Sequence, residues 1–295
     1  MRHIFVPNKT NMSPINCEDC VYPTRVQRGD EVLISVVFTW DKPLAESMGK
    51  YYREVVGASV QIGGPAYGDP GGEFEPGKFT APGVVITHRG CVRSCKFCYV
   101  PKREGQRIRH LEVKAGNIIQ DNNILACNRE HKEKVWTMLR GQRRVSLKGG
   151  LDARLLKDED IENIRSLRLF DLWTAYDSGD NRTASISAIE RLRKAGIPQS
   201  KIRCYVLIAH GGESMADAEA RLSECYKVGA LPFAQVYDKY DGDDLIQWRR
   251  FARTWQRPAI FKSFFKKVTG RTNDSLGETY RVAGEKPGVR RAVSP

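Results

Sequence analysis

The stretch GVVITHRGCVRSCKFCYVP, residues 83–101, joins a short apolar run to three closely spaced cysteines. Gly83–Thr87 has the length and β-branched character of a buried strand. Cys91, Cys95 and Cys98 follow it in a C-x3-C-x2-C arrangement. Thiolates are soft ligands that suit iron–sulfur clusters or zinc. The stretch therefore predicts a metal centre at the carboxyl end of a strand.

Strand-like and helix-like segments alternate along the rest of the chain. Further strands are expected at Asn117–Ile119, Arg144–Lys148, Phe170–Ala175, Ile202–Ala209 and Pro232–Tyr237. Helices are expected at Glu130–Gly141, Lys157–Leu167, Thr183–Ala195 and Ser214–Val228. The basic segment between Cys98 and Asn117 is expected to be a loop in place of a first helix. Six strands with intervening helices predict an α/β barrel or an open parallel sheet, with its site at the carboxyl ends of the strands.

A smaller strand–helix–strand unit precedes this region. Glu31–Trp40 reads as a strand covered on both faces, Asp41 as the cap of a helix running to about Val56, and Ala58–Ile62 as a second strand. Two parallel strands joined by a helix form one unit of a parallel sheet. The Gly- and Pro-rich residues 66–82 are expected to be a linker.

Composition limits the class of protein. The chain has 295 residues, 41% of them hydrophobic, and a formal net charge of +13 from 48 Lys and Arg against 35 Asp and Glu. This is enough apolar sequence for a substantial core. No apolar run reaches the length of a membrane span, and residues 1–10 carry no signal-peptide core, so we expect no membrane association and no secretion by that route. Eight cysteines then indicate reduced thiols or metal ligands, and the expected location is the cytoplasm.

Much of the positive charge lies near the carboxyl terminus. Residues 246–295 hold 12 Lys and Arg against 3 Asp and Glu. Two amphipathic helices are expected there, the first with Trp248, Phe251 and Trp255 on one face and the second with Phe261, Phe264, Phe265 and Val268. The periodicity favours packing of these aromatic residues against the body of the protein. The cations are either solvated or bind the phosphates of a nucleic acid, and residues from Gly270 onward are expected to be poorly ordered.

The cysteine stretch resembles the signature of the radical S-adenosylmethionine (radical SAM) superfamily, C-x3-C-x-aromatic-C, with Phe97 at the aromatic position. The resemblance extends over Pro82–Asp241. It implies a partial (β/α)6 barrel in which Cys91, Cys95 and Cys98 bind a 4Fe–4S cluster, SAM binds the fourth iron, and Phe97 lies near the adenine. It also implies reductive cleavage of SAM to a 5′-deoxyadenosyl radical, hydrogen abstraction from a substrate, and a flavodoxin- or ferredoxin-like electron donor.

Polar residues that follow the expected strands are the candidates for SAM contacts under this resemblance. They are Asp121, Asn122 and Asn123 after the second strand, Lys148 beside Gly149–Gly150–Leu151–Asp152 after the third, Asp177 and Ser178 after the fourth, and Gly211 and Glu213 after the fifth. Asx- and Gly-rich loops are also ordinary turn chemistry. The candidates gain weight because all of them fall at strand carboxyl ends.

The amino-terminal unit resembles a reduced form of the Rossmann-like domain that binds cobalamin in one branch of the superfamily. Its Asp-x-His-x-x-Gly segment is absent, and His3 is the only histidine before the linker, so cobalamin is not expected. The predicted organisation is therefore a Rossmann-like segment at 1–65, a linker at 66–82, the barrel at 83–241 and a basic helical extension at 242–295.

Alternatives remain open on local grounds. His88 with the three cysteines of the stretch would complete a zinc site, which together with the basic tail would make the chain a zinc-stabilised nucleic-acid-binding protein without catalysis. The other five cysteines are either buried thiols or ligands of a second metal; they are Cys17, Cys20, Cys127, Cys204 and Cys225. A nucleic acid or nucleotide is the substrate class that the tail favours, with a peptide or a small metabolite as other possibilities.

Overall fold

The structure is a computed structural model that describes residues 1–15 and 25–268, without the side chains of 264–268. Cys17, Cys20, the side chains of Phe264, Phe265 and Val268, and the tail beyond 268 therefore lie outside the described residues. The chain divides into two compact units, Met1–Leu172 and Trp173–Pro295. No helix among the described residues is long and apolar enough to cross a membrane.

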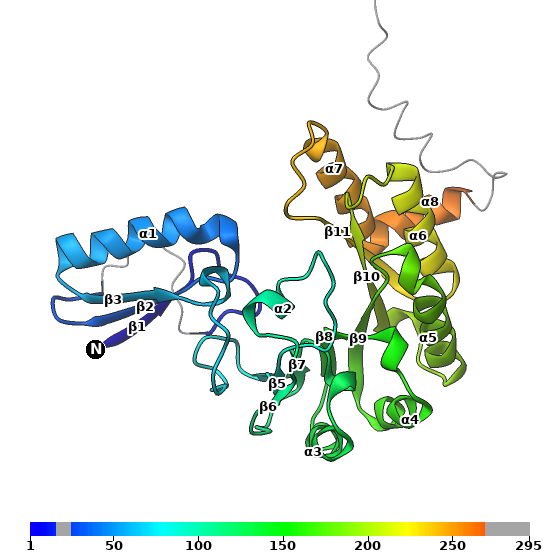
Figure 1. Cartoon of the computed structure of the whole chain (residues 1–295), viewed down its shortest axis with the longest axis horizontal. Coiled ribbons are helices and arrows are strands. Elements are labelled where there is room, and N and C mark those ends of the chain that lie inside the picture. The colour runs from blue at the N-terminus through cyan, green and yellow to red at the C-terminus, as the bar shows by residue number, and fades with distance from the viewer. Residues whose placement is uncertain (16–24, 269–295) are drawn as a thin grey trace, which may run out of the picture. The chain divides into compact units, whose positions relative to one another are not determined.

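The first unit begins with a three-stranded parallel sheet of β1 (Arg2–Phe5), β2 (Glu31–Ser35) and β3 (Ser59–Gly63), in the order β1-β2-β3. Helix α1 (Lys42–Tyr51) lies along one face of this sheet (Figure 1). The strand–helix–strand unit read from the sequence is confirmed. Its neighbour β1 carried no assignment in the sequence, because four residues give too short a pattern to read.

The core of this sheet contains Val32 and Ile34 from β2 with Met48 and Tyr52 from the helical segment, all at most 2% exposed. Leu33, which points to the opposite face of β2, is 9% exposed. Burial on both faces of β2 is therefore confirmed.

Two details differ from the sequence reading here. The strand ends at Ser35 rather than Trp40, whose side chain is 64% exposed. Asp41 is the N-cap residue of α1, as expected, but its side chain makes no capping hydrogen bond. Its buried carboxylate instead accepts a hydrogen bond from Asn8 Nδ2 at 2.5 Å, so a contact with a segment distant in sequence replaces the local cap.

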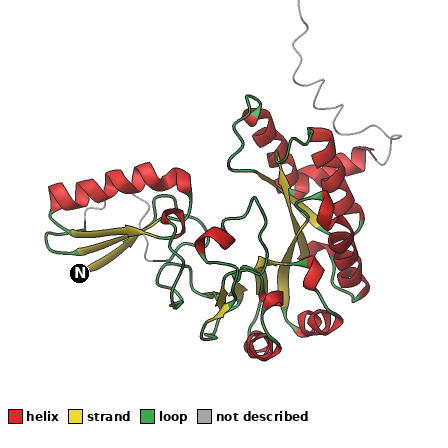
Figure 2. Ribbon diagram, in the orientation of Figure 1, coloured by secondary structure: helices red, strands yellow, loops and turns green. Residues whose placement is uncertain are grey.

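A six-stranded sheet follows, in the order β11-β10-β9-β8-β7-β4. Within it β4 pairs with β7, β7 with β8 and β10 with β11 in parallel. Its strands are β4 (Val84–Val85), β7 (Ile118–Ile119), β8 (Val145–Leu151), β9 (Leu169–Ala175), β10 (Ile202–Ile208) and β11 (Leu231–Val236). Helices α3 (Arg129–Arg140), α4 (Asp158–Ser166), α5 (Arg182–Lys194) and α6 (Met215–Lys227) connect them (Figure 2). The expected α/β class with a parallel sheet is confirmed.

The regions around the first and third strands differ from expectation. β4 has two residues instead of five, and β8 continues to Leu151, so Lys148 lies inside the strand and not after it. The segment expected as a loop contains a short helix, α2 (Val100–Arg103), and the strand β6 (Arg109–His110).

The second unit ends in α7 (Leu245–Gln256) and α8 (Pro258–Val268). Trp248, Phe251 and Trp255 of α7 and Phe261 of α8 are at most 2% exposed. Gln256 Nε2 donates to the carbonyl oxygen of Ala234 in β11 at 3.0 Å. Packing of these four aromatic residues inside the protein is therefore confirmed.

Candidate metal and cofactor site

The three cysteines lie on a loop closed by a small antiparallel hairpin. β5 (His88–Arg89) pairs with β6, so the cysteine loop, which we define as residues 90–108, begins and ends at the same place. The N–H of Leu111 donates to the carbonyl oxygen of Thr87 at 2.8 Å, which adds a further pairing below the hairpin. Four residues, 86–89, separate β4 from the loop, which therefore starts beyond the carboxyl end of that strand.

Cys91, Cys95 and Cys98 form no disulfide bond with another described cysteine and are of intermediate exposure. A turn joins the last two, with the N–H of Cys98 donating to the carbonyl oxygen of Cys95 at 3.0 Å. Phe97 in the same turn is partly exposed. Across 1–15 and 25–268, no three His, Cys, Asp or Glu side chains are gathered closely enough to hold one metal ion. The thiols share one loop without converging on one point.

Asp121 follows β7 and binds the base of the cysteine loop. The residue is 1% exposed, and its carboxylate accepts hydrogen bonds from Thr87 N at 2.5 Å and Thr87 Oγ1 at 2.6 Å. Its Oδ2 also lies 3.3 Å from Nδ1 of His88. Through these contacts Asp121 fixes the end of β4. Its contact with SAM remains a prediction.

Asn123 lies directly beside the first cysteine. Its Nδ2 donates to Cys91 Sγ at 3.9 Å, and its backbone N–H donates to His88 Nε2 at 3.3 Å. An Nε2 that accepts places the His88 ring proton on Nδ1, toward Asp121. The residue is 2% exposed, yet its buried Oδ1 has no hydrogen-bond partner among the residues that the structure describes. A buried amide oxygen in this state favours a ligand that donates a hydrogen bond.

Asn122 binds Glu104, which the sequence analysis did not identify as a site residue. Its Nδ2 donates to Glu104 Oε2 at 2.5 Å. Glu104 follows α2, and its side chain is 1% exposed. The sequence did contain a signal, because seven Lys and Arg lie between 89 and 109 and Glu104 is the one acidic residue among them. A lone carboxylate in such a segment favours an internal ion pair.

β8 passes very close to the residues after β7. A Cβ added at Gly149 would lie 1.7 Å from the carbonyl oxygen of Asp121, so only glycine permits this approach. Asp152, just beyond β8, accepts from Arg93 Nε at 2.7 Å and from Arg154 Nε at 2.7 Å. Burial opposes ionisation of Asp152, but these guanidinium groups outweigh it and lower its pKa. Asp152 thereby links the cysteine loop, through Arg93, to β8.

The remaining candidates belong to the second unit. Asp177 follows β9, and its Oδ1 accepts from Leu207 N at 3.1 Å. Ser178 precedes a 3₁₀ turn at Gly179–Asn181. Gly211 follows β10 with φ +70°, and Glu213 pairs with Arg221. Burial raises the pKa of Glu213. All four residues follow strand carboxyl ends, as predicted, and their contacts with SAM stay predictions.

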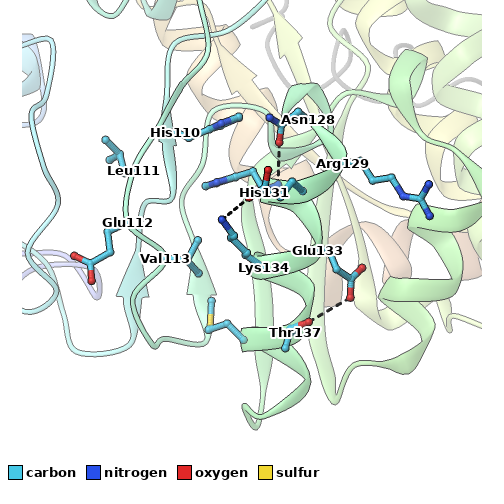
Figure 3. A pocket seen from close by; sticks show the side chains of 12 residues that line it. His110, Leu111, Glu112, Val113, Asn128, Arg129, His131, Glu133, Lys134 and Thr137 are labelled. Carbon is cyan, nitrogen blue, oxygen red and sulfur yellow. Dashed lines mark hydrogen bonds and ion pairs between the residues drawn. The ribbon is translucent and has the colours of Figure 1, made fainter.

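A hollow opens between residues 110–113 and α3 on the first unit (Figure 3). The rings of His110 and His131 stack along it, with centroids 4.2 Å apart. His131 Nε2 lies 3.2 Å from Thr87 Oγ1. Burial, assisted by repulsion from His110, lowers the pKa of His131 to about 4. His131 is therefore a neutral histidine that contacts Thr87, just beyond β4.

The other described cysteines are buried thiols. Burial, with the charge of Asp121, raises the pKa of Cys127 to about 12. Cys204 of β10 and Cys225 of α6 are fully buried with their Sγ atoms 3.6 Å apart. Buried neutral thiols are poor metal ligands, so no described residue supports a second metal site.

No protein-family model matches the chain, and no curated protein matches it significantly. The proposed function therefore rests on the residues of the chain and their positions.

Proposed function

We propose that the chain is a radical SAM enzyme that holds one 4Fe–4S cluster on Cys91, Cys95 and Cys98. The observation that carries the proposal is the position of the cysteine loop, which leaves the carboxyl end of β4 in a parallel sheet. Ligand sites of parallel α/β folds lie at that end of the strands. Under this proposal the six-stranded sheet belongs to a partial (β/α)6 barrel, and the amino-terminal sheet to a reduced Rossmann-like segment. Because the cluster needs reduced thiols, the proposal places the enzyme in the cytoplasm.

The donor set suits the cofactors. Three thiolates on one loop match three irons of a cubane cluster. The Oδ1 of Asn123, which has no partner in the described part of the chain, would accept a hydrogen bond from the ammonium group of SAM beside Cys91. The hairpin already holds the two ends of the loop, so the thiols would converge by rearrangement within the loop.

The bound cluster and SAM would together supply one-electron cleavage of a carbon–sulfur bond, as the resemblance implies. The chain's own residues would position these groups. Asn123 would orient the methionine end of SAM, Asp121 would fix the strand that carries the loop, and Phe97 would lie against the adenine. Lys148, inside β8, would meet the SAM carboxylate, while Asp177, Ser178, Gly211 and Glu213 are proposed contacts of the second unit.

The test is anaerobic reconstitution with iron and sulfide, followed by incubation with SAM and dithionite. We expect a brown protein with about four irons per chain, the content of one cubane cluster, and formation of 5′-deoxyadenosine. Cys95→Ser should lose the cluster, whereas Cys225→Ser, a buried thiol in the other unit, should keep it. A wild-type protein that stays colourless and iron-free after reconstitution would exclude the proposal.

The second candidate is the zinc-stabilised nucleic-acid-binding protein. Its fourth ligand, His88, is fully buried, with Nε2 accepting from Asn123 and Nδ1 directed toward Asp121. Zinc binding would have to break one of these contacts, which ranks this candidate second. Stoichiometric zinc in aerobically purified protein, without SAM cleavage, would reverse the order.

The substrate class rests on charge. The cation excess of residues 246–295 favours a nucleic acid or nucleotide. Binding of a single-stranded oligonucleotide should weaken with salt, and deletion of residues 270–295 should reduce that slope. Salt-independent binding, or no binding, would remove nucleic acid from the proposal. An acidic flavodoxin or ferredoxin is the proposed electron donor.

A further inference from the structure

Glu104 contacts three segments that meet around the cysteine loop. Its Oε2 accepts from the N–H of Gly90, one residue before Cys91, at 3.0 Å. The same oxygen accepts from Asn122 Nδ2 at 2.5 Å, and its Oε1 accepts from Arg103 Nη2 at 2.5 Å. One carboxylate thus binds the start of the loop, the helix after the last cysteine and the segment that follows β7.

The charge of this carboxylate is stabilised inside the protein. Burial opposes its ionisation, but the hydrogen bonds from Gly90, Arg103 and Asn122 outweigh burial and lower the pKa of Glu104. Arg89 Nη1 lies 3.8 Å from Oε1 and adds further positive charge. Glu104 is therefore an anion at neutral pH that satisfies donors from both ends of the loop.

The backbone is closely packed where the chain enters and leaves the cysteine stretch. Gly90 has φ +83°, and a Cβ at this position would lie 2.2 Å from the carbonyl oxygen of Arg107. The N–H of Cys91 donates to the carbonyl oxygen of Gly105 at 3.2 Å. The carboxylate, the glycine and this hydrogen bond all act on the two chain segments that enter and leave the cysteine stretch.

We infer that Glu104 is a positioning residue that holds the two ends of the cysteine loop together, so that Cys91, Cys95 and Cys98 need only a local rearrangement to bind metal. Fixing the ends of a segment in advance removes part of the entropy that binding would otherwise cost. The metal part of this inference rests on the proposed function. The closure of the loop by Glu104 does not, because it concerns the metal-free chain.

The variants for the test are Glu104→Ala, which removes every contact, and Glu104→Gln, which keeps the shape and one acceptor oxygen. Glu112→Gln is the matched control, since Glu112 lies on the same basic segment but is exposed and pairs with Lys114 at 3.6 Å. The first measurement is the alkylation rate of each loop cysteine by iodoacetamide in metal-free protein, resolved by mass spectrometry. We expect the rates at Cys91 and Cys98 to change about tenfold in Glu104→Ala, with an intermediate change in Glu104→Gln.

The second measurement is iron content after reconstitution, with the electron paramagnetic resonance spectrum of the reduced protein. We expect less iron in Glu104→Ala and, where the cluster forms, an altered spectrum. If Glu104→Ala does not fold, Glu104→Gln carries the same comparison. Unchanged alkylation rates in Glu104→Gln and any folded Glu104→Ala, or equal changes in Glu112→Gln, would overturn the inference. A wild-type protein without iron but with Glu104-dependent alkylation would instead refute the proposed function and leave loop closure standing.

Discussion

Gly149 and Asp121 are in direct backbone contact, because a Cβ at position 149 would lie 1.7 Å from the carbonyl oxygen of Asp121. Asp121 in turn holds the end of β4 through Thr87. The contact therefore joins β8, the segment after β7 and the base of the cysteine loop. The sequence analysis placed Gly149 in a segment near SAM, whereas the structure brings it close to the neighbouring segment of the chain.

Gly149→Ala should destabilise the protein strongly. The overlap is with backbone atoms, which cannot move aside as a side chain end can, so we expect a loss of roughly 3 kcal/mol or more in the free energy of unfolding. Urea unfolding followed by circular dichroism measures this. Gly72→Ala is the control, because a Cβ there would meet no atom within 4 Å. Equal stability of the two variants would contradict the close contact.

Asn123→Ala should weaken SAM binding to the reconstituted protein by about tenfold, the effect of one lost hydrogen bond to a charged group. The physical reason is the removal of the buried Oδ1 that lacks a partner. Perturbation of the cluster's paramagnetic resonance spectrum during a SAM titration measures the affinity. Asn163→Ala is a suitable control, because the side chain of Asn163 lies on α4 and donates a hydrogen bond to the carbonyl oxygen of Glu159 in the same helix. An unchanged affinity in Asn123→Ala would remove this residue from the SAM site.

His131 should make stability depend on pH. In the unfolded chain its pKa is the ordinary value of about 6.5, whereas in the folded protein it is about 4. The unfolded state therefore binds the proton first as the pH falls, and the contribution of neutral His131 is complete above pH ~6.5 and lost progressively toward pH ~4.

The measurement is the free energy of urea unfolding between pH 7 and 4.5. His131→Gln keeps a polar group facing Thr87. Between pH 7 and 4.5 we expect its free energy of unfolding to fall by about 2 kcal/mol less than that of the wild type. If the free energy of unfolding depends on pH equally in both proteins, folding does not lower the pKa of His131.

The alternating segments were readable because each long strand and helix has a strong pattern of its own. β10, for example, was expected at Ile202–Ala209 and spans Ile202–Ile208. The short strands β1, β5 and β6 were not readable, since they owe their existence to partners far along the chain. His88 pairs with His110 across the whole cysteine loop, and no local pattern records such a pairing.

In the candidate site, too, features set by local sequence were predicted and those set by long-range contacts were not. The cysteine loop and the polar residues after β7 were located from spacing and order along the chain. The roles of Asp121 and Glu104 were not, because they depend on which groups a carboxylate meets in space. Asp121 has the sequence context of a ligand-binding residue, but both of its oxygens bind the backbone or side chains of Thr87 and His88.

Trp255→Ala should cost about 3–5 kcal/mol in the unfolding of the second unit, the range for deletion of a large buried aromatic side chain. Trp255 is fully buried and stacks on Phe261, with ring centroids 5.7 Å apart. Ile246→Ala on the same helix is the control, because Ile246 is 64% exposed and its truncation should change stability by less than about 0.5 kcal/mol. Urea unfolding monitored by circular dichroism compares the two. A small loss for Trp255→Ala would mean that α7 does not pack as a fixed part of the unit, and the aromatic face would then become available to bind a partner.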